Sequence, residues 1–244
     1  MNYIRLSANT TGFEMERRLP TGCAPLDEIL GGGFRFGDVS LVYGEAATGK
    51  TTLAVSALTR HLRDDPWAKA YYIDSDQKLS TKRLTQIAGD PQLMERLLIW
   101  RPETFREQSR IIEGLPDLLP NGNIPVTVDS ITGPYRLTAG APDRTFTANK
   151  ELNRQLGFLS ETAKTRDAAI LVTGQVYSVL DADPPQVEPV AQRLLRYWSD
   201  AILRLELTSI QGVRQAVLEK PGEEPKACRF SFGEKGLEEA DGPW

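Results

Sequence analysis

The sequence predicts an α/β fold with a mostly parallel central sheet and an antiparallel C-terminal extension. Between residues 39 and 173, short apolar segments typical of strands alternate with segments of helical periodicity. This is the order that builds parallel sheets from strand–helix–strand units. After residue 200, three strand-like segments follow one another with short turns between them. Short turns favour an antiparallel arrangement, so we expect these segments to extend the same sheet.

Length and composition fit one such domain. The chain has 244 residues, of which 40% are hydrophobic, enough for a buried core. We expect residues 20–244 to form this core and residues 1–19 a polar N-terminal arm. No apolar run approaches the roughly 20 residues that span a bilayer, and the N-terminus lacks a secretory signal. We therefore predict a cytoplasmic protein without a membrane partner. Two cysteines and one histidine exclude a disulfide scaffold and a Cys/His zinc site.

Each element is placed from its periodicity and its boundary residues. The strands of the parallel part are expected at 39–43, 70–73, 97–100, 124–128 and 168–173, and those of the extension at 201–207, 213–219 and 227–232. Helices are expected at 25–30, 49–63, 80–88, 105–119 and 149–166. The segment 178–196 is rich in Asp and Pro and is predicted to be a long loop, a feature that is usually functional.

One motif predicts a nucleotide site. Between the first strand and the following helix, the chain matches G-x-x-x-x-G-K-[ST] with Gly44, Glu45, Ala46, Ala47, Thr48, Gly49, Lys50 and Thr51, and Thr52 follows. In this context the backbone N–H groups surround phosphate oxygens at the positive end of the helix. Lys50 would reach the β- and γ-phosphates, and the Thr51 hydroxyl would ligate Mg²⁺. The motif predicts a site for ATP and Mg²⁺; the plainer alternative is an ordinary glycine-containing turn.

Polar residues at the ends of three other strands complete this prediction. Asp129 follows the fourth strand and would act on Mg²⁺ through water, although an Asp there can also be a turn residue or helix cap. Asp74 and Asp76 end the second strand, where one carboxylate could position the water that attacks the γ-phosphate. The alternative for them is to cap the next helix. Gln175, after the fifth strand, could contact the γ-phosphate and respond to its loss.

With these pieces in this order, the chain resembles the RecA-type ATPases and, more narrowly, the archaeal RadB group of RadA-like recombination proteins. The resemblance runs from residue 20 to residue 237 and is carried by the segments LPTGCAPLDEILGGGF, VYGEAATGKTTLA, YYIDSDQKLSTKRL, VDSITGPYRLTAG, NKELNRQLGFLSETAKTRDAAILVTGQVYS, YWSDAILRLE and FSFGEKGLEE. It implies a RecA-like P-loop NTPase core and an ATP-linked, self-associating protein of homologous recombination and DNA repair. It also implies two DNA-facing loops, at 132–148 and 176–197.

Departures from the family pattern modify these expectations. The family usually ends its second strand with Glu where this chain has Asp76. The shorter carboxylate predicts weak, DNA-dependent ATP hydrolysis or none. Gly174 replaces the Asn that usually precedes Gln175. The full-length RadA recombinases carry an N-terminal domain and a Phe-x-x-Ala polymerisation motif, which the first 20 residues do not match. We therefore expect an accessory protein beside a full-length RadA-type recombinase.

The evidence for DNA binding in the residues themselves is limited. The chain has a net charge of −4, and residues 130–204 contain nine basic and eight acidic side chains. This balance gives no strong electrostatic footprint for phosphates. The expected contacts with single-stranded DNA are Arg136, Arg144, Arg193 and Arg196, with Tyr135 and Tyr177 available to stack on bases. Each is otherwise a solvated charge or a partly buried ring.

Two further residues and two further functions stay open at this point. Arg83 could stack on adenine or form a surface salt bridge, and Lys220 could reach the nucleotide of a neighbouring subunit in a homo-oligomer. One alternative function is a signalling ATPase or kinase of the KaiC type, which needs no DNA. The other is an adaptor that binds nucleotide without hydrolysing it.

Overall fold

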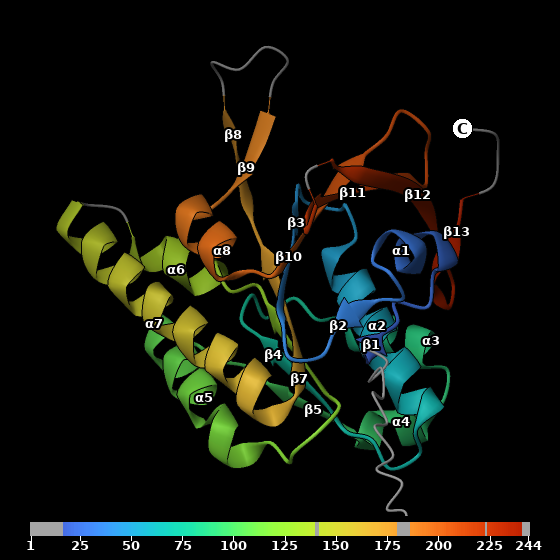
Figure 1. Ribbon diagram of the computed structural model, residues 1–244, viewed down its shortest axis with the longest axis horizontal. Coiled ribbons are helices and arrows are strands. Elements are labelled where there is room, and N and C mark those ends of the chain that lie inside the picture. The colour runs from blue at the N-terminus through green and yellow to red at the C-terminus, as the bar shows by residue number, and fades with distance from the viewer. Residues whose placement is uncertain (1–16, 140–141, 180–185, 223, 241–244) are drawn as a thin grey trace, which may run out of the picture.

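The computed structural model describes residues 17–139, 142–179, 186–222 and 224–240, which form three layers with a central sheet between two groups of helices (Figure 1). The sheet has nine strands in the order β13-β12-β11-β10-β3-β7-β6-β4-β5. Their bounds are β3 Val39–Gly44, β4 Ala70–Asp74, β5 Leu97–Trp100, β6 Ile124–Asp129, β7 Ala168–Gly174, β10 Ala201–Leu207, β11 Val213–Lys220, β12 Lys226–Gly233 and β13 Gly236–Glu239. The predicted α/β architecture is confirmed.

The direction of β10 differs from the prediction. β3, β4, β5, β6 and β7 pair in parallel, as expected, but β10 is also parallel to its neighbour β3. The antiparallel extension therefore begins with the pair β10–β11 and continues through β12 to β13. A helix precedes β10 and returns the chain to the starting edge of the sheet, which makes the parallel pairing possible.

The two groups of helices cover opposite faces of the sheet and enclose two apolar clusters. On one face lie α1 (Ala24–Ile29), α2 (Lys50–Asp64), α3 (Thr81–Ala88) and α4 (Pro91–Glu95). On the other lie α5 (Phe105–Leu118), α6 (Gly133–Thr138), α7 (Pro142–Arg166) and α8 (Gln192–Trp198). None of the helices within the described residues is long and apolar enough to cross a bilayer.

The two segments expected to be DNA-facing loops contain regular structure. In 132–148, α6 and the first two turns of α7 occupy most of the segment. In 176–197, β8 (Val176–Val179) and β9 (Gln186–Pro189) form an antiparallel hairpin, and α8 follows. The prediction of loops was wrong for these parts because β8, β9 and α6 are too short to show a hydrophobic period. Residues 180–185, which include Asp181 and Asp183, lie outside the described residues.

The expected N-terminal arm also falls largely outside the described residues, which begin at Arg17. Its last part belongs to the fold, since β1 (Arg18–Leu19) pairs with β2 (Phe34–Arg35). The Arg17 guanidinium forms a 2.5 Å ion pair with Asp167, the residue that directly follows α7.

Candidate functional site

The turn between β3 and α2 has the geometry of a phosphate-binding loop. Gly49 is the N-cap of α2 and has φ of 102°, which a residue with a side chain rarely adopts. A Cβ at Gly49 would also overlap with the ring of Phe232 on β12. The loop is closed by the Thr48 hydroxyl, which donates to the Glu45 carbonyl at 2.8 Å. Ala46, Ala47 and Glu45 are exposed at its crest, and Thr52 lies in the first turn of α2.

The Lys50 ammonium lies inside this loop. It donates to the carbonyls of Gly44 and Glu45, both at 2.8 Å. Burial lowers the pKa of Lys50 from its usual value, and the nearby charges of Asp129 and Asp76 oppose this effect. A half-buried cation with backbone carbonyls as its partners is suited to exchange them for the stronger acceptors of a phosphate group.

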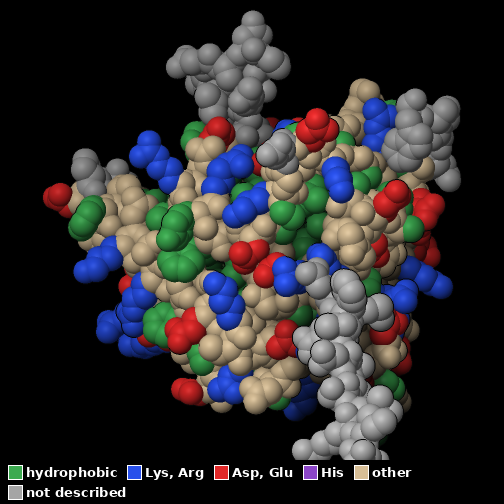
Figure 2. Space-filling model, viewed as in Figure 1, with side chains coloured by type: hydrophobic (Ala, Val, Ile, Leu, Met, Phe, Trp, Pro, Cys, Tyr) green, Lys and Arg blue, Asp and Glu red, His purple; other side chains and the backbone are tan. Residues whose placement is uncertain are grey.

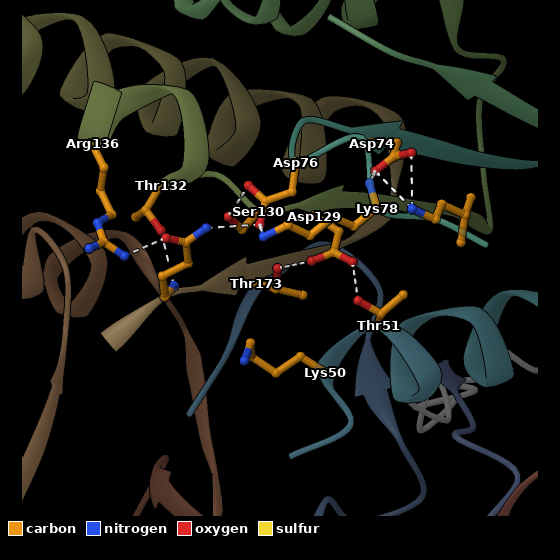
Figure 3. A network of polar contacts seen from close by, with 12 residues as sticks. Lys50, Thr51, Asp74, Asp76, Lys78, Asp129, Ser130, Thr132, Arg136 and Thr173 are labelled. Carbon is orange, nitrogen blue, oxygen red and sulfur yellow. Dashed lines mark hydrogen bonds and ion pairs between the residues drawn. The ribbon is translucent and has the colours of Figure 1, made fainter. Parts of the chain in front are cut away.

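Asp129 is held at the end of β6 by three hydroxyl groups from three different elements. The Thr51 hydroxyl of α2 donates to its carboxylate at 2.5 Å and the Tyr72 hydroxyl of β4 at 2.6 Å, and the Thr173 hydroxyl of β7 donates to its other oxygen. Figure 3 shows the carboxylate between Thr51 and Thr173. Burial, together with the charge of Asp129, raises the pKa of Tyr72 well above its usual value, so the phenol keeps its proton. The structure thus joins the predicted metal residues, Thr51 and Asp129.

The carboxylate that ends β4, Asp74, and the one two residues later, Asp76, have different environments. Asp74 is 1% exposed and accepts hydrogen bonds from the amides of Lys78 and Leu79 at 3.0 and 3.2 Å. Burial raises its pKa, and these two amides oppose the shift. Asp74 therefore shapes the turn. Neither Asp caps α3, because Ser80 is the N-cap and accepts from the Arg83 amide.

Asp76 faces the site and is held by the residues that directly follow β6 and β7. The Ser130 hydroxyl donates to its Oδ1 at 3.0 Å, and the Gln175 side-chain amide donates to its Oδ2 at 2.8 Å. The Lys78 ammonium lies 3.8 Å from the same carboxylate. The structure therefore brings together Asp76 and Gln175, the two residues predicted to act at the γ-phosphate, although 99 positions separate them in the chain.

The sequence was compared with known proteins, and it matches the Rad51 family over residues 15–240. The chain belongs to the Rad51 family. A "DNA repair and recombination protein RadB" from Thermococcus gammatolerans is 38% identical over 228 residues, which cover 91% of this chain and 98% of the relative. One with the same name from Halobacterium salinarum is 32% identical over 234 residues, 93% of this chain and 97% of the relative. A "RadB recombinase" crystal structure superposes with a TM-score of 0.77 at 33% identity and covers 91% of this chain and all of that one. The resemblance drawn from the motifs is confirmed.

Within this Rad51-family site, two predicted residues have backbone partners. The Arg83 guanidinium donates to the carbonyls of Gly233 and Glu234, at 3.0 and 3.2 Å, rather than to a carboxylate. Its role beside adenine stays a prediction. Lys220 donates to the Ser199 carbonyl at 2.5 Å. It lies at the end of β11 that pairs with the start of β10, at the opposite edge of the sheet from the chain's own phosphate loop, and its role in a neighbouring subunit stays a prediction.

The predicted DNA contacts of this family member fall into two groups. Arg136, Arg144 and Arg193 are exposed on α6, α7 and α8. Arg196 instead pairs with Glu219 on β11 at 2.9 Å. Figure 2 shows Lys and Arg side chains around α8 and the base of the β8–β9 hairpin, mixed with hydrophobic ones. The role of these four arginines as DNA contacts stays a prediction.

The two tyrosines expected to stack on bases also differ. Tyr177 is half-exposed, but Tyr135 is 6% exposed, and its hydroxyl donates to Asn149 at 2.8 Å. Its ring packs edge-on against Phe105. The stacking role of Tyr135 is therefore wrong, because α6 turns its ring into the core.

The sequence did not indicate several residues that shape the site. Arg214 on β11 donates to the Ala47 carbonyl at 3.1 Å, and its guanidinium lies over the Phe232 ring. Gly133, at the start of α6, is so close to Asp76 that a Cβ there would overlap with the carboxylate. No signal in the sequence links these positions to the phosphate loop, since each depends on strand register or on a helix of six residues.

Proposed function

We propose that this chain binds ATP with Mg²⁺ at the phosphate loop and acts, in the manner of its RadB relatives, as an accessory protein in DNA repair and recombination. The observation that carries the nucleotide site is the contact between Thr51 and Asp129. These two oxygen ligands are 78 positions apart in the chain, yet they meet at 2.5 Å beside the N-terminus of α2. Hydroxyl and carboxylate oxygens are the donor set that Mg²⁺ takes in P-loop sites.

The residues present fit a nucleotide. The N-terminus of α2 and the N–H groups of the loop favour the phosphates. Lys50 would exchange the carbonyls of Gly44 and Glu45 for phosphate oxygens, and Thr51 and Asp129 would hold the metal ion directly or through water. Bound Mg²⁺ would neutralise charge that develops on the transferred phosphoryl group.

Hydrolysis depends on whether Asp76 reaches the attacking water. Ser130 and Gln175 hold its carboxylate against the start of α6. Because Asp is one methylene shorter than the Glu of the family pattern, we expect weak DNA-dependent turnover or none. An Asp76→Glu variant tests this role: steady-state phosphate release should increase. Unchanged turnover with intact ATP binding would remove Asp76 from the reaction.

For DNA we propose a weak and local contact with a single strand through the exposed arginines of α6, α7 and α8. Arg136, Arg144 and Arg193 offer three phosphate contacts at most, so the logarithmic salt dependence should have a slope of about −2, at roughly −0.7 per contact for single strands. The proposed protein partners are a full-length RadA-type recombinase and, in a homo-oligomer, a second copy of this chain.

ATP turnover measured with and without single-stranded DNA, at two salt concentrations, tests this proposal. Stimulation by DNA that decreases with salt supports the recombination role. An ATP turnover rate that is the same with and without DNA favours a signalling ATPase of the KaiC type. Tight ATP binding without turnover in either condition favours an adaptor that recruits a recombinase. A chain that binds no ATP would contradict the nucleotide site itself.

A further inference from the structure

A chain of hydrogen bonds connects the Asp76 carboxylate to the protein surface. Asp76 accepts from the side-chain nitrogen of Gln175 at 2.8 Å, and the side-chain oxygen of Gln175 accepts from the Arg136 guanidinium at 2.7 Å. Figure 3 labels Asp76 and Arg136, the two ends of this series of contacts. Arg136 is exposed on α6. It lines a groove of about 740 Å³ together with Asp76 and Gln175.

The hydrogen bonds from Arg136 through Gln175 to Asp76 can run in only one direction. A carboxylate can only accept, and a guanidinium can only donate. The Gln175 amide must therefore present its nitrogen to Asp76 and its oxygen to Arg136. The backbone amide of Gln175 is fixed separately, by donating to the Thr132 hydroxyl at 3.0 Å. Arg136 thus sets the orientation in which Gln175 holds Asp76.

α6 contacts Gln175 and Asp76 at two points, both on one side of the helix. Gly133 and Arg136 are three positions apart and so lie on one side of the helix. Gly133 packs directly on the Asp76 carboxylate, while Arg136 holds Gln175. A shift of α6 or of its arginine therefore acts on both residues at the γ-phosphate side of the site.

We propose that Arg136 is a positioning residue that couples a phosphodiester bound on α6 to the contact between Gln175 and Asp76. This inference rests on the proposed function, since it assigns one of the DNA contacts to regulation of the nucleotide site. A phosphate accepts two charge-assisted hydrogen bonds from a guanidinium, each stronger than the bond to a neutral amide. A DNA phosphate at Arg136 therefore draws the guanidinium from Gln175 and frees the amide to turn towards the γ-phosphate. By linkage, ATP in the site changes the affinity for DNA by the same factor.

The experiment measures the affinity for a fluorescent oligothymidylate in the presence of Mg²⁺ with either a non-hydrolysable ATP analogue or ADP. In the wild type the two affinities should differ at least about fivefold, the lower end of typical coupling. In Arg136→Gln this ratio should fall to within about twofold of one, because the variant keeps a polar side chain but loses the cation. Arg136→Lys should recover part of the ratio. Arg144→Gln is the matched control: it removes an exposed arginine from α7, so it should weaken DNA binding but keep the ratio.

The outcomes separate this inference from the proposed function. A ratio that Arg136→Gln leaves at the wild-type value would overturn the inference and leave the nucleotide and DNA sites standing. A wild-type ratio near one, with both ligands bound, would also overturn it. A wild type that does not bind the ATP analogue would contradict the proposed function instead. The melting temperature of each variant, measured without ligands, checks that the fold is intact.

Discussion

The two halves of the candidate nucleotide site are held in different ways. On the metal side, Asp129 accepts from three hydroxyls, and two of them belong to Tyr72 and Thr173, which are 0% exposed in the centre of the sheet. On the γ-phosphate side, Asp76 is held by Ser130 and Gln175. The orientation of Gln175 in turn depends on an arginine that faces solvent. The first half is fixed by the core, and the second by contacts that a ligand can replace.

This difference suggests how nucleotide binding and ATP turnover would be separated at the proposed site. Buried hydrogen bonds to a carboxylate stabilise the fold and would keep the proposed metal ligand Asp129 in place before a nucleotide binds. Contacts near the surface cost less to exchange, so they suit the part of the site that we propose responds to the γ-phosphate and to DNA. Substitutions on the metal side should therefore change stability and nucleotide affinity, while those on the other side should change the response.

The largest effect is expected for Lys50→Met. A charge-assisted hydrogen bond to phosphate is worth about 1.5–3 kcal/mol, so the affinity for Mg·ATP should fall by about 10- to 150-fold. Isothermal titration measures this directly. Because the substitution removes a half-buried charge, the free energy of unfolding without nucleotide should stay equal or increase. Equal ATP affinity in the variant and the wild type would show that the loop does not bind the phosphates.

Thr173→Val, on the metal side, should lower the free energy of unfolding by about 2 kcal/mol, because it leaves a buried carboxylate oxygen of Asp129 without its hydrogen-bond donor. The matched control is Thr127→Val on the neighbouring strand β6. The Thr127 hydroxyl is buried and has no hydrogen-bond partner among the described residues, so its removal should be neutral or stabilising. Urea unfolding of both variants compares them. Equal losses would contradict a special role for the Asp129 contacts.

Gly133→Ala should perturb the γ-phosphate side at a cost of about 1–2 kcal/mol in unfolding free energy, because a methyl group there overlaps with the Asp76 carboxylate and forces α6 or Asp76 to shift. Gly114→Ala is the control. Gly114 lies inside α5 with open space around it, and alanine is the better helix former by roughly 0.5–1 kcal/mol. The pair should differ in sign. An increase in the free energy of unfolding of both variants would contradict the close contact between α6 and Asp76.

The smallest effect concerns the pH dependence of stability without nucleotide. Burial lowers the pKa of Lys50 below 10.5, so the folded chain releases this proton at a lower pH than the unfolded chain. Stability should therefore increase in the wild type relative to Lys50→Met as the pH rises towards 10.5, and decrease as it falls. Thermal unfolding of both proteins between pH 8 and about 10.5 measures the difference. A constant difference would mean that Lys50 is not destabilised by burial.

The sequence predicted the metal side of the site better than the γ-phosphate side. The phosphate loop is contiguous, and Asp129 could be placed because parallel strands end at the same edge of a sheet. The sequence shows Tyr72 only as part of a strand. Its hydroxyl contacts Asp129 because β4 lies beside β6, and the local sequence does not give the order of the strands in the sheet. Asp76 and Gln175 were predicted individually, and Arg136 only as a DNA contact. The approach of Gly133 to Asp76 and of Arg136 to Gln175 depends on a helix too short for a periodic signal. Likewise, the pairing of Arg196 with Glu219 requires the register of β11, which no local pattern encodes.

A crystal structure with Mg²⁺ and a non-hydrolysable ATP analogue tests the contrast between the two halves most directly. We expect the Lys50 ammonium to leave the carbonyls of Gly44 and Glu45 for the phosphates, with the metal ion beside Thr51. Asp129 should keep its hydrogen bonds from Tyr72 and Thr173, while Gln175 changes its partners. The account would be contradicted if the contacts of Asp129 with Tyr72 and Thr173 rearranged while those of Gln175 with Asp76 and Arg136 stayed as they are.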